Sequence, residues 1–273
     1  MKRNLASALY DSQPMQILLA LIIYAVYASV LGVALVPSIA LVRFAARGLS
    51  FASGADLGVR GLFLWGLALG AAVYLYFIWV AVWMATLIRL ISLGMKPGVY
   101  PKASLTTLRW LIHSGIHTIA VKSILPYIPV SYFSNLYFRI MGAKIGKNVY
   151  INTNLLSDAY LMTLEDGVIL GGGSELTCHM MERENLILSR IRIGRDSLIG
   201  TGAFISPGVD IGERCTVGAR CYLRRGAKVA DGTVLTVVAG LPMRTVHGLE
   251  KGRGANITGL GKKVPKPVVH TEL

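Results

Sequence analysis

The sequence has few charged residues and very few cysteines. Charged side chains make up 15% of its 273 residues, whereas a typical soluble domain has roughly 25%. The shortage of charged residues is greatest in the first hundred residues, and this excludes an ordinary soluble domain for that part of the chain. The three cysteines include no Cys-x-x-Cys pair, so a disulfide framework is excluded and a reducing compartment is favoured.

Two long runs contain no charged residue, at 16–36 and 61–88. Each exceeds the ~20 residues with which a helix crosses the hydrocarbon core. They predict two transmembrane helices, roughly 16–42 and 61–93, in a membrane segment over 1–102. The first run is longer than the apolar part of a signal peptide and lacks a clear cleavage site, so we expect it to be retained.

Basic residues outnumber acidic ones and flank the two apolar runs. The formal net charge is +14, with Lys2 and Arg3 before the runs and Arg89 and Lys96 after them. The positive-inside rule then predicts a multi-pass protein of the bacterial inner (cytoplasmic) membrane, with both termini and the second half in the cytoplasm. Membrane lipids are the expected partners of this charge. Nucleic acid is not expected, because the basic residues are scattered and no recognition motif accompanies them.

Residues 103–144 have the pattern of amphipathic interfacial helices. Apolar residues recur at helical spacing up to Ile119, and a second short helix is expected from Ser131 to Met141. The first helix should lie along the membrane surface or pack on the next domain. His113 and His117 share a helical face, but a third metal ligand is lacking nearby, so no metal is expected.

From Ile145 onward the aliphatic residues recur every six positions. Eight of them are strictly spaced, and most are followed by a small residue: Ile193, Ile199, Ile205, Ile211, Val217, Leu223, Val229 and Leu235. This period predicts a triangular solenoid over 145–240, whose coils stack as parallel strands. The phase breaks near 152–163 and 177–192 predict loops that leave the coil. Residues 241–273 lose the period and form a basic C-terminal tail.

Three segments resemble a known superfamily. "NLYFRIMGAKIGKNVYI" (135–151), "GGGSELTCHMMERENL" (171–186) and "IRIGRDSLIGTGAFISPGVDIGERCTVGARCYLRRGAKV" (191–229) resemble the hexapeptide-repeat acyltransferases. With its membrane helices the chain resembles the membrane-bound C-terminal region of polylysine-type peptide synthetases. The resemblance implies a membrane α-helical hairpin followed by an all-β left-handed parallel β-helix.

The resemblance also implies an activity. The expected donor is acyl-CoA, with acetyl-CoA first, or an acyl carrier, and the acyl group passes to a hydroxyl or amine. The membrane helices favour a membrane-associated acceptor: a lipid, a lipid-linked sugar or a surface polymer. Because soluble members are typically trimers, a homotrimer is expected.

His179 is the expected catalytic residue. Acyl transfer needs a base with a near-neutral pKa, and His179 stands where regular coils give way to an irregular loop over 180–192. Glu182, or alternatively Glu184, would orient the imidazole and stabilise its protonated form; either could equally be a solvated loop charge. Cys178 should face away from its neighbour His179, because adjacent residues on a strand point in opposite directions.

The remaining candidate residues would bind the two substrates. Asn154 and Asp158, in the earlier phase break, would contact the acceptor, although asparagine there also suits a turn. A basic cluster would bind the phosphates of CoA, or else contact lipid head groups or solvent. Gly202 and Ser206 would lie beside the pantetheine arm. The basic cluster consists of Arg220, Arg224, Arg225 and Lys228.

Two other functions remain open. A β-helix metalloenzyme such as a carbonic anhydrase would need three histidines on neighbouring coils, whereas 145–250 contains only His179 and His247. A non-catalytic scaffold would use the prism to assemble partners at the membrane. Tolerance of substitution at His179 would favour the scaffold.

Overall fold

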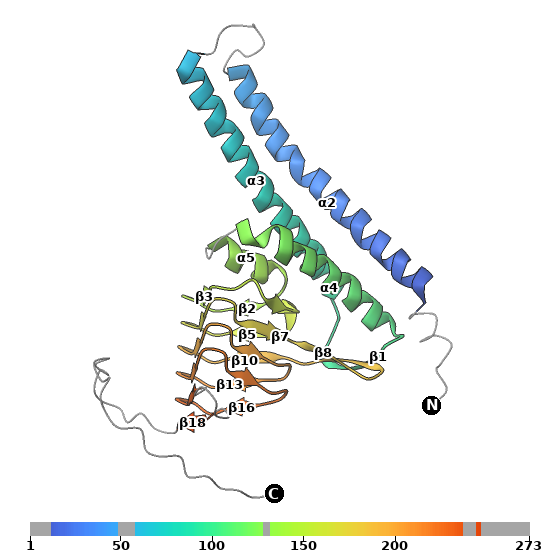
Figure 1. The fold of residues 1–273 in the computed structure, drawn as a ribbon, viewed down its shortest axis with the longest axis vertical. Coiled ribbons are helices and arrows are strands. Elements are labelled where there is room, and N and C mark those ends of the chain that lie inside the picture. Colours follow the sequence, from blue (N-terminus) through green and yellow to red (C-terminus); the bar gives the residue numbers. More distant parts are fainter. Residues whose placement is uncertain (1–11, 49–57, 128–131, 237–243, 247–273) are drawn as a thin grey trace, which may run out of the picture.

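The protein consists of a long helical hairpin, a layer of short helices and a triangular prism of stacked coils (Figure 1). The computed structural model describes residues 12–48, 58–127, 132–236 and 244–246. The basic tail predicted for 241–273 therefore lies outside the described residues, apart from the strand β18 (Arg244–Val246).

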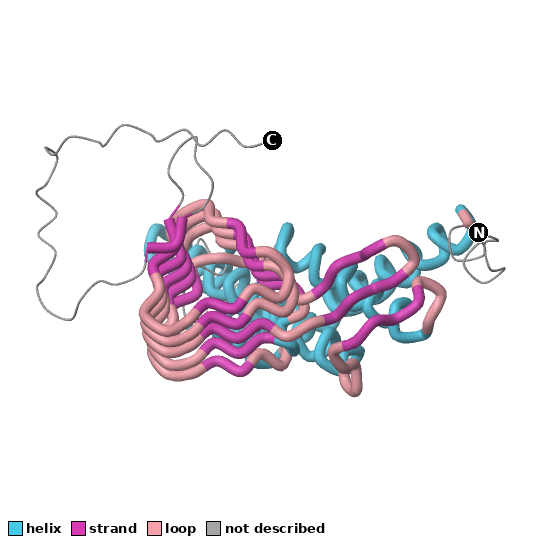
Figure 2. The backbone as a smooth tube through the Cα atoms, turned by 90° about the horizontal axis from the view of Figure 1, so that it is seen from below, coloured by secondary structure: helices cyan, strands magenta, loops and turns pink. Residues whose placement is uncertain are grey.

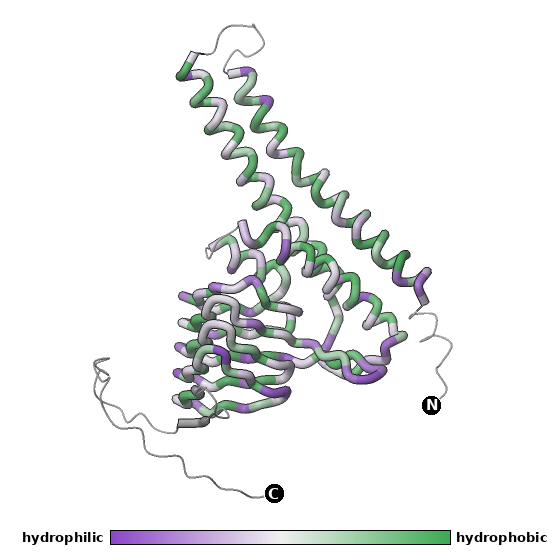
Figure 3. The backbone as a smooth tube through the Cα atoms, viewed as in Figure 1, coloured by the Kyte–Doolittle hydropathy of each residue, from purple (hydrophilic) through white to green (hydrophobic). Residues whose placement is uncertain are grey.

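The hairpin is formed by α2 (Gln13–Gly48) and α3 (Gly58–Ser92). The helices lie side by side, and Ser38 donates a hydrogen bond of 2.8 Å from Oγ to the carbonyl oxygen of Ala72. Hydrophobic residues predominate along both helices (Figure 3), and many of their large apolar side chains are exposed, among them Leu21, Ile39, Phe63 and Leu67. Both helices are long and apolar enough to cross a membrane.

A second helical layer lies between the hairpin and the prism. It comprises α4 (Leu105–Ser123), η2 (Leu125–Tyr127) and α5 (Tyr132–Ile140). Ser104 caps the start of α4 by accepting a hydrogen bond of 3.2 Å from the Thr107 N–H. Arg109 donates to the carbonyl oxygens of Ile91 and Leu93, both at 2.6 Å. The Arg109 guanidinium therefore caps the last turn of α3 and joins α4 to that end of α3.

The prism has three sheets of parallel strands, one along each face (Figure 2). The first sheet contains β2 (Lys144–Ile145), β5 (Met162–Leu164), β10 (Ile191–Ile193), β13 (Asp210–Ile211) and β16 (Lys228–Val229). The second contains β3 (Tyr150–Ile151), β6 (Ile169–Leu170), β11 (Leu198–Ile199), β14 (Thr216–Val217) and β17 (Val234–Thr236), which also pairs with β18. The third contains β4 (Leu156–Ser157), β7 (Glu175–Thr177), β12 (Phe204–Ile205) and β15 (Tyr222–Leu223).

The six-residue period is the cause of this architecture. Every step of six places one aliphatic side chain inside the prism, where it stacks on its equivalent one coil away, as Ile205 pairs with Leu176 and Leu223. Ile205 is fully buried. The corners need small residues, since a Cβ on Gly194 would collide with the backbone of Gly212. The predicted fold class, a helical hairpin followed by a left-handed parallel β-helix, is confirmed.

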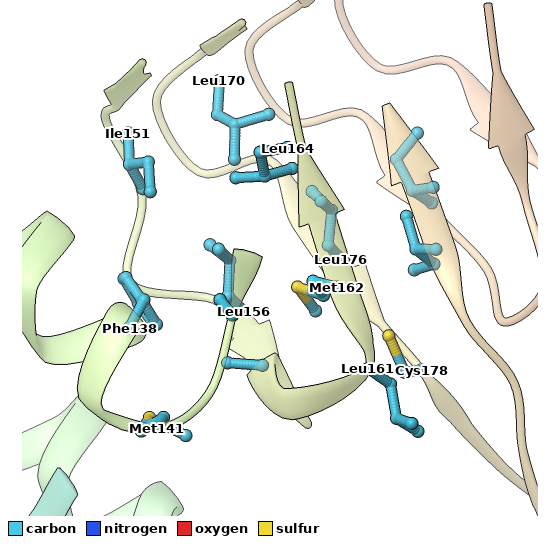
Figure 4. Packing of buried hydrophobic residues seen from close by; sticks show 14 of the residues in the cluster. Phe138, Met141, Ile151, Leu156, Leu161, Met162, Leu164, Leu170, Leu176 and Cys178 are labelled. Atoms are coloured by element: carbon cyan, nitrogen blue, oxygen red, sulfur yellow. The ribbon is translucent and has the colours of Figure 1, made fainter. Parts of the chain in front are cut away.

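Helix α5 closes the end of the prism that faces the helices. Phe138 and Met141, both fully buried, sit over the aliphatic stack of the first coils, beside Leu156 and Ile151 (Figure 4). The solenoid core therefore continues into the helical layer without a break, which fixes the helices relative to the prism.

The segment expected to be an irregular loop at 180–192 is mostly regular. It forms the antiparallel hairpin of β8 (His179–Glu182) and β9 (Asn185–Leu188). Strand β1 (Gly98–Pro101), which follows α3, pairs antiparallel with β9. The alternation of buried and half-buried residues along β9 explains the difference, because it gives one strand face a core to pack against.

Candidate active site

Four turns of the prism meet along one edge, which we call the hairpin corner. They connect β4 to β5, β7 to β10, β12 to β13 and β15 to β16. The β8–β9 hairpin leaves the prism from the second of these turns. A second edge, the glycine corner, carries the turns at 152–155, 171–174, 200–203 and 218–221. Residues at the two corners are separated by the strands of the third sheet.

His179 and Asp158 meet at the hairpin corner. The imidazole Nδ1 lies 2.6 Å from Asp158 Oδ2, so its N–H donates to the carboxylate. Thr177 Oγ1 lies 3.2 Å from the same nitrogen. The side chain of Asp158 is 1% exposed and that of His179 is 26% exposed. The imidazole therefore reaches the surface while the carboxylate stays inside.

The backbone turns Asp158 toward the histidine. Its φ of 62° and ψ of 46° place it in the left-handed region, which aspartate and asparagine adopt more readily than most other non-glycine residues. Asp158 starts η3 (Ala159–Leu161), yet its side chain makes no capping hydrogen bond there. The carboxylate is thus free for His179. This residue occupies the first phase break, where the coil departs from its six-residue repeat.

Helix α4 supplies further contacts to this pair. Trp110 donates a hydrogen bond of 3.0 Å from Nε1 to Asp158 Oδ1, and its ring centroid lies 4.7 Å from that of His179. His113 Nδ1 lies 3.8 Å from Asp158 Oδ1. Burial raises the pKa of Asp158, but the hydrogen bond and charge of His179, together with the Trp110 N–H, outweigh it and lower the pKa. Asp158 is therefore a carboxylate at neutral pH.

Two histidines of α4 are buried between the helical layer and the prism. His113 is 1% exposed and His117 is 5% exposed. Burial lowers the pKa of His113, and it lowers that of His117 to about 4. His117 Nδ1 lies 3.1 Å from the Tyr137 hydroxyl. Both rings are consequently neutral near pH 7. In the part of the chain that the structure describes, no group of three metal-ligating side chains is found.

Glu182 does not contact the imidazole. Its carboxylate instead pairs with Arg225, with Oε2 2.8 Å from Nη1. The reason lies in the strand: Glu182 is three residues from His179 on β8, so the two side chains point to opposite faces. The expectation that Glu182 orients His179 is therefore wrong, and Asp158 occupies that position.

The expected acceptor residues are also placed differently. Asp158 is buried and engaged by His179 and Trp110, so contact with an acceptor is excluded for it in this arrangement. Asn154 is half-buried at the glycine corner, at the other end of β4 from the histidine. Cys178 is fully buried, and burial raises the pKa of its thiol well above the usual value.

The basic cluster expected to bind the donor is divided between edges of the prism. Arg224 and Arg225 lie at the hairpin corner, two coils from the turn that carries His179, and both are exposed. Arg220 lies at the glycine corner, where its N–H bonds to the Thr201 carbonyl oxygen at 2.9 Å. Lys228 begins β16 on the first sheet.

The two residues expected beside the pantetheine arm also lie apart. Ser206 stands at the hairpin corner and is fully buried. Gly202, with a φ of 66°, forms the turn at the glycine corner. Of the six expected donor residues, Ser206, Arg224 and Arg225 share an edge with His179.

The geometry defines the protonation state that the site can use. Because Nδ1–H donates to Asp158, the Nε2 atom of a neutral imidazole carries the lone pair. Among the described residues none hydrogen-bonds to Nε2. The pair can therefore accept a proton at Nε2, and the carboxylate stabilises the imidazolium that results.

Sequence reasoning missed Trp110 and the role of Asp158. Trp110 lies 48 residues from Asp158, and Asp158 lies 21 residues from His179. The available signal was a single acidic residue in the first phase break, one coil before the histidine.

The comparison with known proteins agrees with the repeat pattern. Residues 190–225 match the family of bacterial transferase hexapeptide (six repeats) proteins. The delta-poly-L-ornithine synthetase of Acinetobacter baumannii is 30% identical over 178 residues, which are 65% of this chain and 13% of that protein. The galactoside O-acetyltransferase of Escherichia coli is 30% identical over 130 residues, which are 45% of this chain and 58% of that protein.

A solved structure of similar type is the maltose O-acetyltransferase from Clostridium difficile. It is 17% identical, with a TM-score of 0.43, over 57% of this chain and 94% of that one. Of the two curated relatives, by contrast, the chain spans only 13% and 58% of the length.

Proposed function

We propose that this chain, whose residues 190–225 match the hexapeptide family of bacterial transferases, is a membrane-embedded acyltransferase. It takes an acyl group, acetyl or another short acyl, from acyl-CoA. The group passes to a hydroxyl or amine of a membrane-associated acceptor: a lipid, a lipid-linked sugar or a surface polymer.

One observation carries the proposal: the Asp158–His179 pair, with Nε2 of the imidazole free at the edge of the prism. A buried carboxylate that holds an exposed imidazole in one tautomer suits a general base. A scaffold has no need of a buried carboxylate held against a partly exposed imidazole.

The reaction follows from this geometry. Nε2 of His179 takes the proton of the acceptor hydroxyl or amine as its oxygen or nitrogen attacks the thioester carbonyl. The tetrahedral intermediate collapses, the C–S bond breaks and the imidazolium returns the proton to the CoA thiolate. Asp158 stabilises the imidazolium throughout. The products are the acylated acceptor and free CoA.

The hairpin corner suits the donor. Arg224 and Arg225 stand on the edge that leads to His179, and guanidinium groups bind the phosphates of a nucleotide in bidentate fashion. Arg225 already pairs with Glu182 at 2.8 Å. A phosphate would have to displace that exposed carboxylate, which costs little.

Charge distribution supports the membrane location. From Leu57 to Ser157 the sequence has nine Lys and Arg residues and no acidic residue, whereas 158–236 has nine basic and ten acidic residues. The basic excess thus belongs to the helices and to the layer where the hairpin meets the prism. Anionic lipid head groups attract such a layer, and the positive-inside rule then favours a prism on the cytoplasmic side of a bacterial inner membrane.

A homotrimer is proposed as the assembly. The second sheet of the prism carries an exposed apolar row in register, with Tyr150 65%, Ile169 43% and Leu198 39% exposed. The first sheet is charged instead, with Arg192 paired to Glu165 and Asp210. Apolar rows of this kind favour packing against another protein surface.

The test is acyl transfer by the purified full-length protein in nanodiscs. Radiolabelled acetyl-CoA and a total lipid extract of the host serve as substrates, and both labelled lipid and free CoA thiol are measured. His179→Ala should reduce transfer roughly 10²- to 10⁴-fold. Met180→Ala, on the opposite face of the same strand, is the matched control and should retain activity. A folded His179→Ala protein with wild-type turnover would refute the assignment.

The orientation of the protein in the membrane is tested separately, in intact cells that produce the Ala55→Cys or the Leu260→Cys variant. The introduced cysteine is labelled with a reagent that does not cross the membrane. Labelling from outside should reach position 55 alone. Labelling of position 260 would overturn the cytoplasmic prism.

A further inference from the structure

Helix α4 contributes a hydrogen bond, from Trp110 to Asp158, that has no part in the acyl-transfer steps themselves. Trp110 is 7% exposed and lies between the helical layer and the hairpin corner. Its indole N–H is bonded to one oxygen of Asp158, while His179 is bonded to the other. We propose that Trp110 is a positioning residue, so that α4 completes the catalytic site of the prism; this inference rests on the proposed function.

The carboxylate of Asp158 has one hydrogen-bond donor at each oxygen. Asp158 is 1% exposed, so solvent is not available to its oxygens. A buried carboxylate needs a hydrogen-bond donor at each oxygen, since an unmet charge in the interior is costly. Oδ2 has His179 at 2.6 Å and Oδ1 has Trp110 at 3.0 Å. Trp110 therefore fixes the plane of the carboxylate that orients the imidazole.

The Trp110 ring also packs against the imidazole of His179. The indole and imidazole centroids are 4.7 Å apart, with the rings tilted by 58°. One side chain thus holds Asp158 through its N–H and limits the rotation of His179 through its ring. Either contact alone would suit simple packing, whereas the two together act on both members of the pair.

Helix α4 is itself held in place by hydrogen bonds near its start. Ser104 caps its first turn, and the Thr107 hydroxyl donates to the Pro101 carbonyl oxygen at 2.9 Å. One turn on, Arg109 donates to two carbonyl oxygens at the end of α3. Trp110 directly follows Arg109 on this anchored part of the helix, so its N–H is aimed by the contact of α4 with α3 as well as by the prism.

Removing the indole N–H of Trp110 should therefore affect catalysis more than packing. Trp110→Phe keeps a ring beside His179 but leaves Oδ1 without this donor. The carboxylate can then rotate, so the imidazole is held less firmly in the orientation and tautomer that proton transfer at Nε2 needs. The kcat should fall about 10- to 100-fold, the scale of one hydrogen bond to a charged group. The KM for acetyl-CoA should stay within about twofold, because Arg224 and Arg225 are untouched.

The experiment combines kinetics with histidine and indole NMR on the full-length protein in nanodiscs. Turnover is measured from pH 5 to 9 with acetyl-CoA and the host lipid extract, as the release of CoA thiol. The tautomer of the His179 ring is read from its ¹⁵N resonances, which should show the proton on Nδ1 in the wild type and a mixture of tautomers in Trp110→Phe. Trp83→Phe is the matched control, because Trp83 lies on α3 with 42% of its surface exposed; it should match the wild type in every measurement.

A second measurement needs no active protein. The Trp110 indole resonance, identified by its loss in Trp110→Phe, should exchange slowly with solvent and shift in Asp158→Asn. An unshifted indole in Asp158→Asn, or a Trp110→Phe protein with unchanged kcat and an unchanged His179 tautomer, would overturn the inference. If His179→Ala also retains full activity, the proposed function fails as well; if His179→Ala is inactive, only the role of Trp110 is refuted.

Discussion

The buried histidine of α4 makes the stability of this protein depend on pH. His117 is fully enclosed between the helical layer and the first coil, and burial lowers its pKa to about 4. In the unfolded chain the same ring has a pKa of about 6.5. At a pH between these two values, His117 is protonated in the unfolded chain and neutral in the folded protein. The free energy of unfolding therefore falls as the pH drops.

The magnitude follows from the shift. A difference of about 2.5 pKa units corresponds to about 3 kcal/mol, at 1.36 kcal/mol per unit. This contribution is fully present above pH 6.5 or so, and it is lost progressively as the pH falls toward 4. Against the 5–15 kcal/mol of a typical folded domain, roughly 3 kcal/mol is a large fraction. We expect a marked drop in the unfolding temperature between pH 7 and pH 5.

The assay is thermal unfolding of the wild type and His117→Gln in detergent across this range, followed by intrinsic fluorescence. Glutamine stays neutral and retains an amide beside Tyr137, so His117→Gln should lose much of the pH dependence while being less stable at pH 7. Asn135→Gln, a neutral change on the neighbouring helix α5, controls for general effects of substitution. If the wild type and His117→Gln show parallel pH profiles, the ring does not titrate on unfolding and the argument from burial is refuted.

Three further outcomes are expected. Asp158→Asn should lower kcat roughly 10²- to 10⁴-fold with little change in folding. An amide N–H facing Nδ1 favours the imidazole tautomer that cannot accept a proton at Nε2. Steady-state kinetics and circular dichroism check this, and a near-normal kcat would contradict it. Arg225→Ala should raise the KM for acetyl-CoA several-fold, whereas Glu182→Gln should leave kcat within about twofold; equal losses of kcat in both would disprove the separate roles. Ile205→Asp should prevent folding, since it places a charge inside the fully buried aliphatic stack, and a monodisperse, soluble variant with wild-type unfolding temperature would count against the packing.

Much of the fold could be predicted because its cause is local and repeated. From Ile193 to Leu235, every sixth residue is aliphatic and marks one step of the coil. The strands pair in the register that this spacing implies. The uncharged runs likewise predict the helices α2 and α3, since length and apolar composition are properties of the run itself. His179 could be predicted as a candidate because a break in the period marks where the chain leaves the coil.

The partners of that histidine depend on tertiary structure alone. Glu182 is near in sequence but points to the opposite face of β8, whereas Asp158 is brought to His179 by the stacking of two coils. Trp110 reaches the same carboxylate only because α4 is held between α3 and the prism. The period of a solenoid specifies which side chains point inward, but hydrogen bonds at its corners depend on backbone angles and on what packs there. Those are set by contacts between residues 21 and 48 positions apart, which no local pattern in the sequence records.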